Sequence, residues 1–335
     1  MELSTNTTVT LKNIKAIAAS FLLTLILLPQ AGLLNAGAFD ALKELTSGIE
    51  TPIQPQVPAP GTLGAVRPLK VYFISVGQGD STYIELPNGA NVLIDGGPSN
   101  SATSSLASFL SSHQVAKLDN VVLTHPHSDH FAGLQYVFSN LTVTNFFDTM
   151  ADNTGSTGDD AVRAKAKSMG VNIVHPSAGD TLAWDPGEVQ VKVLNSCSTP
   201  VSSSVGQVLN DCSIVLKVTY QNTSMLFTGD MQDDVEATLV KEYGADLRAD
   251  VLKVGHHGSR YSSSDAFLAE VRPHDAYISV GTGNTYGFPT SDCLSRLQNA
   301  GAIVHRTDLD GTMEYTAGGT SSQASTADTV PPLKY

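Results

Sequence analysis

The sequence of 335 residues predicts a single α+β domain in which sheets are covered by helices. Between residues 69 and 317, segments with the apolar pattern of strands alternate with single segments of helical spacing. Two early strands are joined by Pro87, Asn88 and Gly89, a turn typical of a hairpin. Neither end of the chain has such periodicity, and the roughly 250 residues between the ends suffice for one hydrophobic core.

The elements follow from local pattern. Apolar runs rich in β-branched residues and bounded by turn residues predict strands at residues 69–76, 81–86, 91–95, 120–124, 213–220, 224–228, 250–254, 276–280, 302–306 and 311–316. Apolar residues at helical spacing predict helices at residues 104–112, 131–139, 161–169, 231–243, 265–271 and 291–300.

The first 38 residues have the pattern of a secretory signal peptide. Polar residues with Lys12 and Lys15 precede an apolar run at residues 16–34, and small residues follow at positions 36–38. We expect cleavage after Ala38 and a secreted or periplasmic protein. An uncleaved membrane anchor is the alternative, because about 20 apolar residues can span a bilayer.

Two further segments flank the predicted domain. Residues 39–68 contain five prolines, so no regular element can run through them, and we interpret them as a linker. Residues 318–335 are rich in Ser, Thr and Ala, which predicts a flexible tail. The folded domain is therefore expected within residues 69–317.

The charge of the chain limits its partners. The formal net charge is −13 and no stripe of Lys and Arg is visible, which argues against strong nucleic-acid binding. No stable protein partner is indicated. The three cysteines are an odd number for a secreted chain, and one disulfide with one buried thiol is the simplest arrangement. Cys197 and Cys212 flank a Ser-rich loop and can form that pair; three unpaired buried thiols are the alternative.

A dense group of metal-ligating side chains follows the strand at residues 120–124. His125, His127, Asp129 and His130 fall within six positions, in a chain with only nine histidines. A loop after a strand can turn these side chains toward one point. Imidazole and carboxylate together suit zinc, manganese or iron in open hydrolytic sites.

Two other strand ends offer ligands of the same kinds. Asp230 follows the strand at residues 224–228, and a single carboxylate can bridge two metal ions. His256 and His257, between Gly255 and Gly258, follow the strand at residues 250–254. We expect these side chains to reach the same ions as the first group.

Taken together, these segments resemble the metallo-β-lactamase superfamily of binuclear metallohydrolases, and within it the ComEC-type branch. The resemblance covers nearly all of residues 69–317. It includes the segments Val76 to Ser81, Leu93 to Gly97, Thr124 to His130, Leu226 to Asp230, Asp250 to Ser259, Ser279 to Pro289 and Arg306 to Asp308. It implies a four-layer αββα sandwich with the metal ions where strand ends converge.

The resemblance also implies roles for the predicted ligands. His125 and His127 would hold one divalent ion, Asp129 and His130 the other, and Asp230 would bridge them. His256 or His257 would complete a shell, and the choice between them stays open. We expect zinc, with manganese as the alternative. Asp80 and Asp95 would orient the histidine loop.

The sequence departs from the family pattern at two places. Residues 210–213 (Asn, Asp, Cys, Ser) contain no histidine where the superfamily often has one, although this branch commonly lacks it. Phe288 stands where the branch usually has a ligating histidine. The second ion would then bind more weakly, be held by His305 or Asp308, or be absent.

The resulting functional expectation is metal-dependent hydrolysis, with a phosphodiester as the expected substrate. Asp129 would accept the proton of the attacking water, and His257 or Ser259 would contact the substrate. Hydrolysis of another ester, a lactone or a β-lactam is an alternative, because fold alone does not select among these reactions. A metal-binding but catalytically idle domain is the alternative from another class.

Overall fold

The computed structural model describes residues 67–99, 101–318 and 323–326, all within one compact unit, Gly64–Tyr335. The predicted signal peptide and all but the last two residues of the predicted linker lie outside these residues. Within the described part of the chain, no helix is long and apolar enough to cross a membrane.

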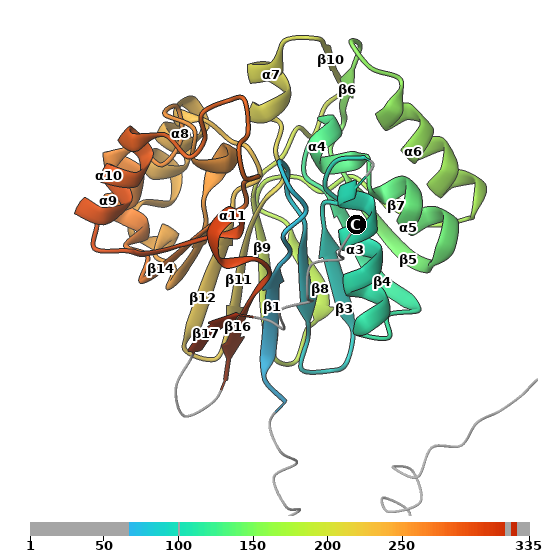
Figure 1. Ribbon diagram of the computed structural model, residues 1–335, viewed down its shortest axis with the longest axis horizontal. Coiled ribbons are helices and arrows are strands. Elements are labelled where there is room, and N and C mark those ends of the chain that lie inside the picture. The colour runs from blue at the N-terminus through green and yellow to red at the C-terminus, as the bar shows by residue number, and fades with distance from the viewer. Residues whose placement is uncertain (1–66, 100, 319–322, 327–335) are drawn as a thin grey trace, which may run out of the picture. The chain divides into compact units, whose positions relative to one another are not determined.

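Two mixed sheets form the centre of the fold (Figure 1). The eight-stranded sheet has the order β17 (Gln323–Thr326), β16 (Met313–Ala317), β1 (Leu69–Phe73), β2 (Thr82–Glu85), β3 (Asn91–Ile94), β4 (Lys117–Leu123), β5 (Thr142–Asp148) and β7 (Asn172–Val174). The seven-stranded sheet has the order β15 (Ile303–Arg306), β14 (Asp275–Ile278), β13 (Val251–Lys253), β12 (Thr223–Phe227), β11 (Val215–Tyr220), β9 (Val189–Asn195) and β8 (Thr181–Asp185). A separate parallel pair joins β6 (Ala151–Asn153) and β10 (Val201–Ser203).

Helices cover the outer face of each sheet. The first sheet packs against α3 (Ser101–Ser112), α5 (Leu134–Asn140) and α6 (Gly158–Ser168), and the second against α8 (Asp233–Tyr243), α9 (Asp265–Val271) and α10 (Ser291–Asn299). Three short helices, α4 (Ser128–Phe131), α7 (Gly206–Asp211) and α11 (Thr307–Asp310), and two 3₁₀ turns, η1 (Gly244–Leu247) and η2 (Gly255–Gly258), complete the fold.

Three layers of apolar side chains hold this stack together. The central layer joins the two sheets and includes Phe73, whose ring stacks on that of Tyr277 at 3.9 Å between centroids. The two outer layers lie between each sheet and its helices. This arrangement of helix, sheet, sheet and helix confirms the predicted αββα sandwich.

Several strands were not predicted. We expected no strand between the predicted helices at residues 131–139 and 161–169, where the structure has β5. We also expected none between that second helix and the predicted strand at residues 213–220, where it has β7, β8 and β9. β9 alternates Val189, Val191 and Val193 inward with exposed residues between, so a strand signal was present there. β17, which pairs with β16, uses residues 323–326 of the predicted tail; the remaining tail residues beyond 318 lie outside the described part.

Candidate metal centre

Three strand ends from the two sheets meet at one edge of the sandwich. β4 ends at Leu123 and leads into the histidine loop and α4, whereas β12 and β13 of the other sheet lead to Asp230 and to η2. The two sheets are linked at this edge because the Ile214 backbone N–H donates to the Thr124 carbonyl at 3.0 Å. Residues far apart in the sequence are thereby brought to one point.

Asp230 lies at the centre of the resulting cluster. Four imidazole nitrogens approach its Oδ2 atom: His130 Nε2 at 3.3 Å, His257 Nε2 at 3.4 Å, His125 Nε2 at 3.8 Å and His256 Nε2 at 4.0 Å. The Asp230 side chain is buried. This is the position that the sequence predicted for a bridging carboxylate.

His127 and Asp129 complete the group on its more open side. His127 Nδ1 lies 2.9 Å from His125 Nε2, and Asp129 Oδ2 lies 3.2 Å from His257 Nε2. Two of the overlapping sets whose ligand atoms all lie within 4.8 Å consist only of predicted ligands: His125, His130 and Asp230 in one, and Asp129, His130 and His257 in the other. All seven predicted ligands therefore lie in one cluster.

The two adjacent histidines of η2 differ in their surroundings. His257 is buried and belongs to the second ligand set, whereas His256 is partly exposed and its Nδ1 lies 3.4 Å from Gln232 Nε2. Both residues have positive φ, 47° and 54°, and Gly258 follows at 82°. A side chain at Gly258 would lie within 2.5 Å of Pro289, so glycine is required at that position. The turn directs both imidazoles toward Asp230.

Asp95 orients the histidine loop, as predicted for this carboxylate. Its Oδ2 atom accepts from His130 Nδ1 and from the Thr124 hydroxyl, each at 2.8 Å, and its Oδ1 accepts from the Thr124 N–H. The Thr124 hydroxyl oxygen lies 3.0 Å from His125 Nδ1. Both imidazoles are held through Nδ1, which leaves Nε2 of each facing Asp230.

On the other side of the cluster, Asp80 contacts His257 and forms an ion pair with Lys253. We did not predict a role for Lys253. Asp80 Oδ2 lies 2.7 Å from Lys253 Nζ, and Asp80 Oδ1 lies 3.4 Å from His257 Nδ1. His257 Nδ1 also lies 2.9 Å from the Ser279 carbonyl oxygen. A lysine between apolar residues of a buried strand, three positions before a histidine pair, was the signal that could have identified Lys253.

The histidine-free stretch at residues 210–213 supports the cluster through the Ser213 hydroxyl. The Asp230 backbone N–H donates to Ser213 Oγ at 3.1 Å.

A disulfide joins Cys197 to Cys212, in agreement with the expected pair, and Cys293 is a buried free thiol.

The charges in this cluster favour a bound cation. Burial opposes ionisation of Asp230, but His257, His130 and His256 hold the pKa of that carboxyl well below its usual range. Burial opposes protonation of His130 and His257, yet the neighbouring carboxylates, Asp230 first, hold the pKa of both imidazoles well above the usual value. A divalent ion can supply this positive charge in place of the protons.

Unsatisfied buried atoms point to the same conclusion. Within the described part of the chain, Asp230 Oδ1 and His130 Nε2 are buried and have no hydrogen-bond partner. Leaving such atoms unpaired is costly, and metal coordination would satisfy both. The donor set of imidazoles and carboxylates therefore fits divalent transition-metal ions.

Phe288 faces this cluster, although it cannot act as a ligand. Its ring centroid lies 5.5 Å from that of His256 and 6.4 Å from that of His257. The suggestion that His305 or Asp308 replaces the missing histidine is wrong. His305 Nε2 lies 2.7 Å from an Asp275 oxygen and Asp308 is paired with an arginine, and neither shares a ligand set with the cluster.

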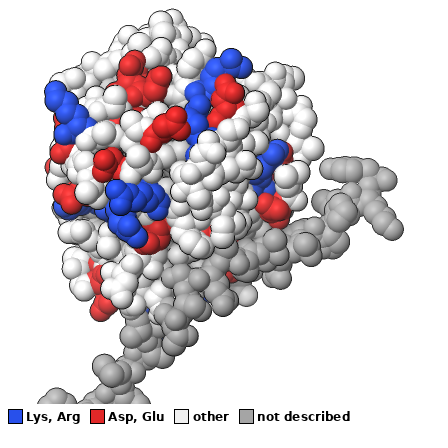
Figure 2. All heavy atoms as spheres, turned by 90° about the vertical axis from the view of Figure 1, so that its left-hand side faces the viewer, with Lys and Arg blue, Asp and Glu red and all other residues white. Residues whose placement is uncertain are grey.

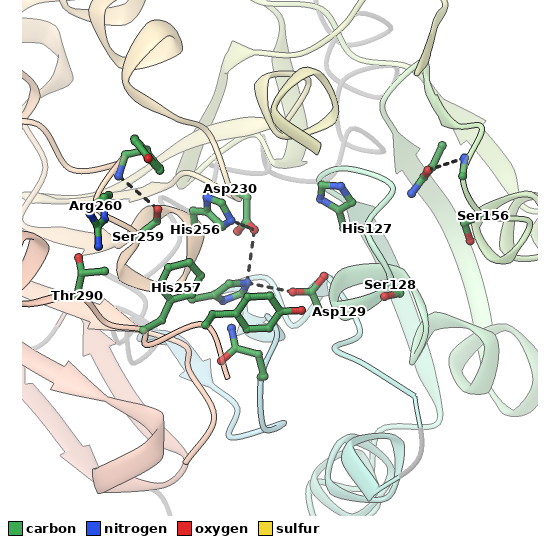
Figure 3. Close-up of a pocket in the computed structure, with 16 residues that line it drawn as sticks. His127, Ser128, Asp129, Ser156, Asp230, His256, His257, Ser259, Arg260 and Thr290 are labelled. Carbon is green, nitrogen blue, oxygen red and sulfur yellow. Dashed lines mark hydrogen bonds and ion pairs between the residues drawn. The ribbon is translucent and has the colours of Figure 1, made fainter. Parts of the chain in front are cut away.

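A cavity of about 800 Å³ opens onto the cluster. Figure 3 shows Asp129, Asp230 and His257 near its middle, with Ser259, Arg260 and Thr290 on one side and Ser128 and Ser156 on the other. The remaining lining residues are Gln78, His127, Asn153, Gly155, His256, Tyr261, Tyr286 and Phe288. A substrate can thus reach the ligating atoms from solvent.

Comparisons with known proteins agree with this geometry. Residues 74–196 match the family model of the metallo-beta-lactamase superfamily. ComE operon protein 3 of Bacillus subtilis (strain 168) is 30% identical over 262 residues, which are 73% of this chain and 33% of that protein. Competence protein ComA of Neisseria gonorrhoeae is 31% identical over 242 residues, 72% of this chain and 31% of that protein. The chain thus spans about a third of these relatives.

Among solved structures, the metallo-beta-lactamase fold protein YhfI from Bacillus subtilis is 14% identical with a TM-score of 0.47, covering 72% of this chain and 96% of YhfI. A diphosphatase of the PhnP family is 14% identical with a TM-score of 0.43, covering 74% of this chain and 99% of that one. Together with the αββα layers and the His and Asp cluster, the family match and the curated relatives show that this chain contains a metallo-beta-lactamase superfamily domain distantly homologous to the ComEC-type competence proteins.

Proposed function

We propose that this chain is a metal-dependent phosphodiesterase that uses an activated water molecule. The observation that carries the proposal is the position of Asp230: a buried carboxylate, surrounded by four imidazoles, at the base of an open cavity. Bound divalent ions would lower the pKa of a water molecule toward neutrality and stabilise charge on the phosphoryl oxygens. We propose two ions, zinc first and manganese as the alternative, with the second ion weakened by Phe288.

The residues around the ions have separate roles in this proposal. Asp129 is the proton acceptor: it is partly exposed to the cavity and lies beside His257 at 3.2 Å. Burial opposes its ionisation, but His130 and His257 lower its pKa to about 2, so it is a carboxylate at neutral pH. His257 holds Asp129 in place and lines the cavity where it can contact the substrate.

The cavity contains one side chain that suits an anionic ester. Arg260 is the only Lys or Arg that lines it, is exposed, and makes no salt bridge within the described part of the chain. Its guanidinium can pair with a phosphate oxygen that the ions do not contact. This favours a phosphodiester over a neutral lactone or simple ester.

A long polyanion is not expected to bind tightly by charge alone. On the face seen in Figure 2, Lys and Arg side chains lie beside Asp and Glu rather than in a continuous stripe, and the chain has a net charge of −13. We therefore propose that recognition occurs in the cavity, on a phosphodiester or other ester that is small or is presented by a polymer. We propose no stable protein partner.

We also propose that the protein acts outside the cytoplasm, secreted or periplasmic, with membrane anchoring as the alternative. The apolar run at residues 16–34 supports this, and so does the Cys197–Cys212 disulfide, because such bonds persist in oxidising compartments. Fractionation of expressing cells tests it: recovery of the chain in the cytosol would contradict the proposal.

The experiment that tests the activity combines metal analysis with turnover. The full-length chain, incubated with zinc or manganese, is expected to hold one to two ions by elemental analysis and to hydrolyse bis(p-nitrophenyl) phosphate. Asp230→Ala should abolish turnover, reduce the metal content and leave the circular dichroism spectrum unchanged. Equal kinetics in Asp230→Ala and the parent would refute the bridging role.

The second candidate is a catalytically idle metal-binding domain, and Phe288 is the observation that favours it. The same preparation decides between the two. Bound metal without turnover of bis(p-nitrophenyl) phosphate, p-nitrophenyl acetate or the β-lactam nitrocefin supports the idle domain. Turnover of p-nitrophenyl acetate or nitrocefin, without turnover of bis(p-nitrophenyl) phosphate, supports hydrolysis of another ester or of a β-lactam.

A further inference from the structure

Tyr286 is an unusually exposed aromatic residue for a cavity wall. It lies in the loop between β14 and α10, lines the cavity, and is 67% exposed. Phe288 covers one face of its ring, since the two rings are stacked with centroids 5.7 Å apart and planes 14° apart. Phe288 itself packs against the apolar layer under α8, α9 and α10. Tyr286 is thus an exposed ring supported on one face by the partly buried Phe288.

The loop that presents Tyr286 is held in one conformation. The Asn284 side chain closes it: Nδ2 donates to the Gly281 carbonyl at 3.0 Å and to the Phe288 carbonyl at 2.7 Å, and Oδ1 accepts from the Phe288 N–H at 3.0 Å. At the base of the loop, the Thr290 hydroxyl donates to the Gly258 carbonyl at 3.1 Å. A ring on a pre-ordered loop loses little conformational entropy when it binds a ligand.

The exposed ring also stands next to the proposed hydrolytic centre. Phe288, on which Tyr286 stacks, contacts the rings of His256 and His257. The opposite side of the cavity includes the polar residues Ser128, Asn153 and Ser156, and Tyr261 is a second exposed tyrosine of the lining. Among the described residues, Tyr286 rather than Tyr261 has its ring stacked on an aromatic residue that contacts the histidines of the cluster, so a flat group attached to a phosphoryl centre near Asp230 can lie on it.

We propose that Tyr286, supported by Phe288, is a stacking subsite for a planar aromatic or heteroaromatic ring that the substrate carries on its phosphodiester. This inference rests on the proposed phosphodiesterase function and assigns Tyr286 as a residue that determines specificity. Aromatic rings pack against each other in offset-stacked or edge-to-face arrangements with a gain beyond that of apolar burial, whereas a saturated ring of similar size does not have this gain. The substrate class is thus a ring-bearing phosphodiester.

Two non-hydrolysable probes of matched size test the subsite by binding: phenylphosphonate and cyclohexylphosphonate, titrated by calorimetry into the zinc-loaded full-length chain. We expect the parent to bind phenylphosphonate about threefold to tenfold more tightly. Tyr286→Leu should remove this preference, and Tyr286→Phe should retain it. Leu309→Ala, at a hydrophobic residue that is 70% exposed but does not line the cavity, is the matched control and should leave both affinities unchanged.

The outcomes separate this inference from the function on which it rests. Equal binding of the two probes, or a phenyl preference that survives in Tyr286→Leu, overturns the stacking subsite and leaves the phosphodiesterase intact. Failure of both probes to bind, together with no hydrolysis of bis(p-nitrophenyl) phosphate, overturns the proposed function and the subsite with it. Loss of the preference in Tyr286→Leu, with the preference kept in Tyr286→Phe and in Leu309→Ala, supports the assignment.

Discussion

Replacing Lys253 with methionine removes the charge partner of Asp80 from the interior of the domain. The side chains of Lys253 and Asp80 are 3% and 5% exposed. Lys253 Nζ lies 2.7 Å from Asp80 Oδ2 and also donates to the Val254 carbonyl at 2.9 Å. Burial opposes ionisation of Asp80, yet Lys253 and then His257 lower its pKa to about 2. Lys253→Met therefore leaves a carboxylate buried without its main counter-charge.

The size of the effect follows from this burial. Breaking a buried ion pair by removing one partner costs about 3–5 kcal/mol, because the remaining charge is left in a low-dielectric interior. His257 Nδ1, 3.4 Å from Asp80 Oδ1, stays as a partial partner, so the lower value applies, about 3 kcal/mol. For a domain of this size, each kcal/mol shifts Tm by roughly 2–4 °C, which predicts a decrease of about 6–12 °C.

Urea denaturation followed by circular dichroism measures the loss in free energy of unfolding. Lys192→Met, at an exposed position on β9 of the same sheet, is the matched control and should change stability by no more than about 0.5 kcal/mol. The double variant Asp80→Asn with Lys253→Met should recover part of the loss, since no charge then stays unpaired. Equal stability of Lys253→Met and Lys192→Met would refute the reasoning.

Three further predictions concern other sites. Phe288→His should lower the zinc concentration needed for half-saturation, because an imidazole beside His257 can ligate and a phenyl ring cannot; a titration against a competing chelator measures this, and unchanged affinity contradicts it. Burial raises the pKa of the Cys293 thiol to about 11, so iodoacetamide at pH 8 should alkylate the urea-unfolded chain but not the folded one, as read by mass spectrometry. The third prediction concerns Asp275. Burial opposes ionisation of this carboxyl, but hydrogen bonds from His305 and His274 lower its pKa. Its stabilisation is then present above about pH 4 and lost as the pH falls through the lowered value. The difference in unfolding free energy between the parent and Asp275→Asn should therefore shrink from pH 5 to pH 3; a constant difference would argue against this linkage.

The predicted elements show which features of the fold are local. The helix at residues 265–271 was predicted with its observed bounds, because its apolar residues recur at helical spacing; in the structure the Ser264 side chain caps it by accepting from the Phe267 N–H. β7, in contrast, has only three residues and forms by pairing with β5, so its own sequence contains too little pattern to identify it. β5 and β9 had strand patterns that we did not use, and their omission was an error of interpretation.

The candidate site also combines features that the local sequence predicts with features that depend on the tertiary structure. The residue types within six positions of His125, and the carboxylate and histidines that follow two other strands, were sufficient to predict which side chains gather. Their spacing could not distinguish His256 from His257, since that depends on a turn with positive φ at both residues.

The sequence by itself therefore determined an α+β domain with helices covering sheets and the membership of the ligand cluster, because strand periodicity and a short ligand motif are properties of neighbouring residues; the αββα order of layers came from the family resemblance. Only the tertiary structure decided that Lys253 pairs with Asp80 and that Phe288 supports an exposed Tyr286. These contacts join segments that are remote in the chain, and they exist because the packing of two sheets brings the strand ends together and excludes water from the charges between them.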